Sequence, residues 1–216
     1  MSTSKDSASK TTTRDEEKYY EPIRQHLIAV FSNRYVEHDK FPLQDALLEN
    51  LPKIIQIEEL GQKNREISDI VKKEFDDTTL NIIRDERIYP DLVGFVQKNP
   101  SKEKEIIIVE VKDEPITLKM VEQTRFYSEV FNATFAFLIS TKGIEENKVR
   151  FLLKKPKIRA GIIIAKFKET GSIEINKRFK ETTPEFLHMY LRPREYESKQ
   201  DKSSGWKNRF FNVRRS

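Results

Sequence analysis

The sequence predicts an α/β domain in which a mixed central sheet is flanked by helices. Apolar residues recur at helical spacing from Tyr20 to Phe31, which favours a first helix packed by one face. The continuous apolar run 106–109, bounded by turn residues, is typical of a strand buried on both faces. A second helical pattern then leads to another apolar strand at 134–140, and a short helix at 145–153 and a hairpin around Gly171 are expected after it. Helices and buried strands that alternate in this way indicate one layered core.

Composition narrows the class of protein further. A chain of 216 residues suits one domain with tails or an insertion. The absence of cysteine excludes a disulfide framework, and three scattered histidines do not suggest a zinc site. With no long apolar run and no signal-peptide core, we expect a soluble, cytoplasmic protein without a membrane partner. The net charge of +5 favours an anionic partner.

Composition also divides the chain into segments. Residues 1–14 are mostly Ser, Thr and Lys, so we expect a disordered N-terminal segment. A single domain is expected over 15–192, with a helical insertion at 36–79 where apolar residues follow helical spacing. Residues 193–216 form a tail that interleaves aromatic and basic residues. This tail could fold back on the domain, contact a second copy in a homodimer, bind nucleic acid or serve as a partner peptide.

Charged residues interrupt the two central apolar segments. Asp91 follows Pro90 inside a strand expected over 87–96, and Glu110, Val111 and Lys112 end a strand expected over 105–112. Because side chains alternate along a strand, Glu110 and Lys112 leave the same face one pleat apart. Such groups are costly at the end of a buried strand unless they pair or bind something. If Asp91 lies level with them on the neighbouring strand, the three groups converge in an acidic pocket that holds one lysine.

A helix is expected directly after these strands. Thr117 is a suitable N-cap for it. Gln123 and Tyr127 are four residues apart and therefore share one face of this helix. Gly94, within the first of the two strands, indicates a bulge or a close approach of another backbone.

These features, taken in order, resemble known nuclease motifs. Three pieces are similar to the PD-(D/E)XK nuclease superfamily and to the QxxxY motif of its RecB-like branch: Pro90-Asp91, Glu110-Val111-Lys112, and Gln123 to Tyr127. The resemblance covers roughly residues 15–140. It implies a restriction-endonuclease-like core with the element order αβββαβ, and it makes 15–192 a nuclease domain.

The resemblance also implies a metal site and a mechanism. Asp91 and Glu110 would bind Mg²⁺, with Mn²⁺ as a substitute, because both cations prefer hard oxygen ligands. The backbone carbonyl of Val111 would add a ligand. Lys112 would hold or deprotonate the attacking water. The alternative is a purely structural ion pair between Lys112 and a carboxylate.

Further members of the site follow from the resemblance. Many members of the superfamily carry a glutamate on the first helix, ahead of an aromatic-x-Pro-Ile run like the one at 20–23. That spacing favours Glu17, with Glu21 as the second choice. Gln123 would touch the phosphate, the water or the strand end through its amide, and Tyr127 would lie against the same pocket.

The expected function is metal-dependent hydrolysis of phosphodiester bonds in DNA, as an endonuclease or exonuclease. One alternative is a catalytically inactive DNA-binding protein of the same fold. Another is an archaeal-type Holliday-junction resolvase, which would share the first two motifs but would not need Gln123 and Tyr127.

Overall fold

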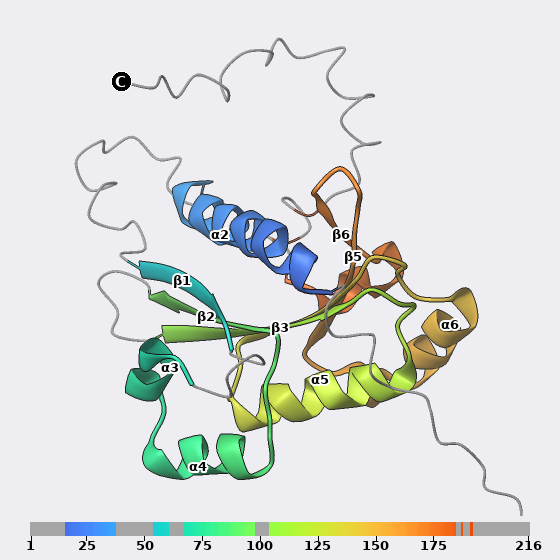
Figure 1. Cartoon of the computed structure of the whole chain (residues 1–216). Coiled ribbons are helices and arrows are strands. Elements are labelled where there is room, and N and C mark those ends of the chain that lie inside the picture. The colour runs from blue at the N-terminus through green and yellow to red at the C-terminus, as the bar shows by residue number, and fades with distance from the viewer. Residues whose placement is uncertain are drawn as a thin grey trace, which may run out of the picture.

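A six-stranded mixed sheet forms the centre of the molecule (Figure 1). The computed structural model describes residues 16–37, 54–60, 67–97, 104–184, 187 and 191. The strands lie side by side in chain order: β1 (Ile54–Glu59), β2 (Leu92–Gln97), β3 (Lys104–Lys112), β4 (Phe135–Ser140), β5 (Ile162–Phe167) and β6 (Ile173–Ile175).

Strand direction changes across the sheet. β1, β2 and β3 are antiparallel neighbours, whereas β4 runs parallel to β3 and β5 runs parallel to β4. Each parallel step requires a crossover, which is made by α5 (Leu118–Val130) and then by α6 (Glu146–Lys154). β6 returns antiparallel to β5. The carboxyl ends of β3, β4 and β5 therefore lie at one edge of the sheet.

Helix α2 (Tyr20–Glu37) covers one face of the sheet (Figure 1). The predicted apolar stripe of this helix is confirmed, because its members are all buried against the strands: Tyr20, Ile23, Leu27, Val30 and Phe31. Pro22 lies in the first turn, where a proline does not break a helix. A short 3₁₀ turn, η1 (Glu17–Tyr19), precedes the helix.

The other face is covered by α3 (Asp69–Glu74), α4 (Asp77–Asp85), α5 and α6 (Figure 1). Tyr127 and Phe131 pack there beside Ile108 of β3, and Val149 and Leu152 of α6 pack in a neighbouring cluster. Thr117 caps α5 as predicted, since its side chain accepts a hydrogen bond from the Met120 amide. Together with α2, these are the five α-helices of the described part of the chain.

The prediction that 36–79 is helical is wrong at 54–59, where the chain forms the edge strand β1. Three isoleucines favour a strand here through their branched side chains. The strand is too short to reveal its period, and the pairing with β2 decides its conformation. Helix α3 and the start of α4 do fall within the predicted range, whereas 38–50 lies outside the described residues.

The first motif strand begins later than the sequence suggested. It was expected from Arg87, but β2 starts at Leu92, so Asp91 directly precedes the strand. Gly94 is needed for close approach: a Cβ there would lie 2.8 Å from Ile57 Cγ1 and 3.1 Å from the Gln56 carbonyl oxygen. The strand at 134–140, the helix near 145–153 and the hairpin around Gly171 are confirmed.

The expected tails, 1–14 and 193–216, lie outside the described residues. Within the described ranges, no helix is both long and apolar enough to cross a membrane.

Candidate active site

Asp91 is held in place by both backbone and side-chain contacts. Its carbonyl oxygen accepts a hydrogen bond from the Leu60 amide at 3.2 Å, which ties it to the end of β1. Its carboxylate accepts one bond from the Val111 amide at 2.7 Å and another from the Tyr20 hydroxyl at 2.6 Å. Asp91 is therefore buried and fixed against the end of β3 and against α2.

Lys112 lies among three carboxylates. Its Nζ is 3.2 Å from Glu110 Oε2, 3.7 Å from Asp91 Oδ2 and 3.7 Å from Glu16 Oε2. The convergence of Asp91, Glu110 and Lys112 that the sequence predicted is confirmed. We call these four residues the carboxylate cluster: Glu16, Asp91, Glu110 and Lys112.

The carboxylate that the first helical segment contributes is Glu16. The sequence suggested Glu17, with Glu21 as the second choice. Glu17 is partly exposed in turn η1, and Glu21 is exposed and pairs with Arg24 instead. Glu16 precedes Tyr20 by four residues, so a helical wheel anchored on the buried Tyr20 places both on one face. That was the signal in the sequence that could have identified it.

Gln123 and Tyr127 are brought together as the i, i+4 spacing predicted. The Gln123 Nε2 donates to the Tyr127 hydroxyl at 2.8 Å. Burial raises the pKa of Tyr127; the Gln123 hydrogen bond lowers it, and the charge of Glu110 raises it again. The phenol therefore lies within the electrostatic reach of the cluster from the α5 side, and Gln123 is held to the phenol.

The pKa values of the cluster are shifted because several ionisable groups are buried together. Burial raises the pKa of Glu110 from 4.5 to about 8; the charge of Asp91 adds to this rise, and Lys112 opposes it. Burial likewise raises the pKa of Asp91 against the opposing charge of Lys112. Burial alone would lower the pKa of Lys112. The negative charges of Glu110, Asp91 and Glu16 outweigh this effect of burial, so the pKa is raised. The lysine is therefore protonated at neutral pH.

The cluster has an excess of negative charge and an unsatisfied oxygen. Three carboxylates and one ammonium give −3 + 1 = −2 when all are ionised. Glu110 Oε1 is buried and accepts no hydrogen bond from any described residue. A buried acceptor without a partner is costly, and more so when it is charged. A second cation would relieve both problems.

The residues present fit a hard divalent cation in their chemistry, since carboxylate and carbonyl oxygens are its preferred ligands. The described residues contain no group of three His, Cys, Asp or Glu side chains already arranged around a common metal position. The ammonium of Lys112 lies between the carboxylates instead. Its side chain is 15% exposed and that of Glu16 is 12% exposed, compared with 3% for Glu110, so these two members of the cluster have room to move towards solvent.

Asp113 extends the network beyond the predicted residues. Its amide donates to Glu16 Oε1 at 3.3 Å, and its carboxylate accepts hydrogen bonds from Tyr19 and Thr141. The Thr141 bond, ahead of the Tyr19 bond and the charges of Lys18 and Lys142, lowers the pKa of Asp113. This residue ties η1 to the carboxyl ends of β3 and β4, and so holds Glu16 near Lys112.

Comparison with known proteins gives no match: no family model fits the sequence, and no curated protein is detectably similar to it.

Proposed function

We propose that the protein is a metal-dependent nuclease that hydrolyses phosphodiester bonds in DNA. The observation that carries this proposal is the carboxylate cluster, which sets three carboxyl groups around one lysine and leaves the buried Glu110 Oε1 without a hydrogen bond from any described residue. A structural ion pair needs only one carboxylate for one lysine. Three carboxylates around Lys112 exceed that need and suit a site that takes a cation and a phosphate.

The element order supports a restriction-endonuclease-like core. Helix α2, strands β1, β2 and β3, helix α5 and strand β4 follow one another in the order αβββαβ, with α3 and α4 inserted between β1 and β2. The proposed site lies where Asp91 enters β2 and where Glu110 and Lys112 end β3. Strands β5 and β6 extend this core beyond β4.

In this proposal, Asp91, Glu110 and the carbonyl of Val111 hold Mg²⁺ or Mn²⁺. The cation supplies charge neutralisation at the phosphate and lowers the pKa of a bound water. Tyr20 fixes the Asp91 carboxylate by donating to it, and burial together with the charge of Asp91 raises the pKa of Tyr20, so it stays a donor. The Asp91 ligand is thus oriented by neighbouring groups, as metal sites generally require.

Lys112 acts as a hydrogen-bond donor in the cluster without a metal. Its pKa is raised in the cluster, so it remains protonated and can orient the attacking water or a phosphate oxygen. Glu16 holds the ammonium near the site at 3.7 Å. Gln123 and Tyr127 form the α5 wall of the site through their mutual hydrogen bond.

DNA cleavage by matched glutamine variants tests the proposal. Glu110→Gln keeps the side-chain shape and removes a ligand charge, whereas Glu114→Gln makes the same change at an exposed neighbouring residue. In Mg²⁺, the first variant should lose about 10²-fold or more of the cleavage rate, and the second should match the wild type. Chelator should abolish cleavage in all three proteins. Equal rates for Glu110→Gln and the wild type would refute the assignment of the site.

A further inference from the structure

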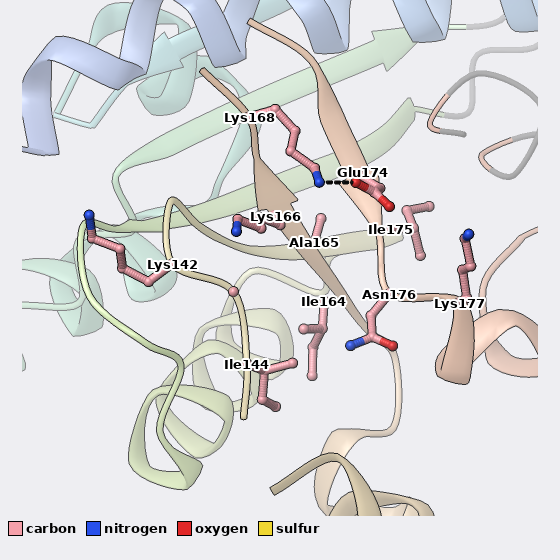
Figure 2. A pocket seen from close by; sticks show the side chains of 11 residues that line it. Lys142, Ile144, Ile164, Ala165, Lys166, Lys168, Glu174, Ile175, Asn176 and Lys177 are labelled. Carbon is pink, nitrogen blue, oxygen red and sulfur yellow. Dashed lines mark ion pairs between the residues drawn. The ribbon is translucent and has the colours of Figure 1, made fainter. Parts of the chain in front are cut away.

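A basic pocket lies beside the carboxylate cluster, at the ends of β5 and β6 (Figure 2). It has a volume of about 420 Å³, which is within the range of small-molecule sites. Four lysines line it: Lys142, Lys166, Lys168 and Lys177. Figure 2 shows Lys142, from the loop after β4, on the opposite side of the pocket from Asn176 and Lys177.

The charge of the pocket is largely uncompensated. Glu174 is the one carboxylate in its lining, and it pairs with Lys168 at 2.6 Å (Figure 2). Lys142, Lys166 and Lys177 form no ion pair with any residue that the structure describes. Lys142 also acts on the Asp113 carboxylate through its charge, but none of the three lysines is ion-paired with a described residue, and together they favour an anionic ligand.

The sheet places this pocket in line with the proposed catalytic lysine. Lys112 of β3 pairs in register with Ser140 of β4, and Ser140 pairs in register with Lys166 of β5. Residues in register on parallel strands point to the same face. Two strand spacings of about 4.8 Å put Lys166 about 10 Å from Lys112 along the sheet edge.

The loop after β4 completes the pocket and is built tightly. The buried hydroxyl of Ser140 donates to the Glu114 carbonyl at 2.6 Å and accepts from the amides of Lys142 and Gly143, both at 3.0 Å. Gly143 has φ +77°, and a Cβ there would lie 3.4 Å from the Lys166 side chain. The loop therefore has a fixed shape that packs Gly143 against Lys166 and sets Lys142 at the rim.

We propose that this pocket binds the phosphate backbone of the same DNA strand that is cleaved at the carboxylate cluster. The inference rests on the proposed function and adds the path of the substrate: along the carboxyl ends of β3, β4 and β5. A distance of about 10 Å is short enough for one strand to reach from the carboxylate cluster to the pocket within a few nucleotides. Lys142 and Lys166 take the phosphates, and the half-buried apolar side chain of Ile144 accepts a sugar or base.

Equilibrium binding of a single-stranded oligonucleotide, measured in chelator over a range of salt concentrations, tests this path. The double variant K142Q/K166Q should bind more weakly than the wild type at low salt. Loss of two phosphate contacts at about 0.7 each should reduce the slope of log affinity against log salt by about 1.4. The matched control K72Q/K73Q removes two lysines from α3, away from the pocket, and should retain the wild-type slope.

A second variant tests the pocket without removing a lysine. Asn176→Asp is isosteric and keeps the Oδ1 atom that accepts the Arg178 amide, so the fold should be retained. The new negative charge should weaken binding at low salt, and the loss should shrink as salt rises.

The outcomes separate this inference from the proposed function, because binding in chelator involves no cleavage. A protein that binds as expected but cleaves nothing would refute the nuclease proposal alone. Unchanged affinity and slope in K142Q/K166Q, or an equal loss in K72Q/K73Q, would overturn the phosphate path. A pocket that binds a free mononucleotide but leaves DNA affinity unaffected by either pocket variant would overturn it as well.

Discussion

Removing the charge of Glu110 should stabilise the protein when no divalent cation is present. The folded state holds a proton on Glu110 up to a pKa of about 8, whereas the unfolded chain releases it near 4.5. Between these values the native state binds more protons, so the free energy of unfolding falls as pH rises. At pH 7 the interval from 4.5 spans 2.5 pH units at 1.36 kcal/mol each, or roughly 3 kcal/mol.

Glu110→Gln resembles the protonated side chain at every pH and should escape this loss. Below pH 4.5 the variant and the wild type should be about equally stable, and the advantage of the variant should grow from there to pH 8. Saturating Mg²⁺ should reverse the order, because the cation stabilises only a protein that keeps its ligands.

Denaturant unfolding in chelator across this pH range measures the effect, with Glu114→Gln as the control that should follow the wild type. Parallel stability curves for Glu110→Gln and the wild type would show that Glu110 is ionised at little cost. The reasoning about the buried, unsatisfied carboxylate would then be refuted.

Three other perturbations follow from the structure. Glu16→Gln should lower the cleavage rate more than Glu17→Gln does, because Glu16 lies 3.7 Å from Lys112; equal rates would remove Glu16 from the site. Gly94→Ala should cost about 1–3 kcal/mol of unfolding free energy, since the new Cβ would meet Ile57 at 2.8 Å, and an unchanged denaturation midpoint would contradict this. Burial lowers the pKa of His26, so its contribution to stability is lost as pH falls below about 6.5; His26→Gln should flatten the pH dependence of the melting temperature there.

The centre of the candidate site could be predicted from the sequence because charged residues stand out beside buried apolar strands. Asp91, Glu110 and Lys112 are charged residues next to buried strands, and strand alternation places two of them on one face. Their convergence then required only that β2 and β3 be neighbours, which a short connection between them favours. The four-residue spacing of Gln123 and Tyr127 was likewise enough to predict that they lie together, because residues at that spacing share one face of a helix.

Apart from Glu16, the parts that the sequence missed depend on the fold as a whole. Glu16 was missed because the family resemblance drew attention to Glu17, whereas the spacing of Glu16 from the buried Tyr20 was the better guide to the residue that faces the cluster. Strand β1 is determined by its pairing with β2 and not by its own pattern. The basic pocket joins Lys142, Lys166 and other residues from separate segments, and only the parallel crossovers bring them together.

Calorimetric titration of Mn²⁺ into the wild-type protein and into Asp91→Asn tests the central claim most directly. The wild type should bind the cation at the carboxylate cluster, and at pH 7 it should release protons, because Glu110 must ionise to become a ligand. Asp91→Asn keeps the shape of the side chain but loses its charge, so it should bind far more weakly and release fewer protons. Absence of binding in the wild type, or equal binding and proton release in both proteins, would contradict a metal site in the cluster.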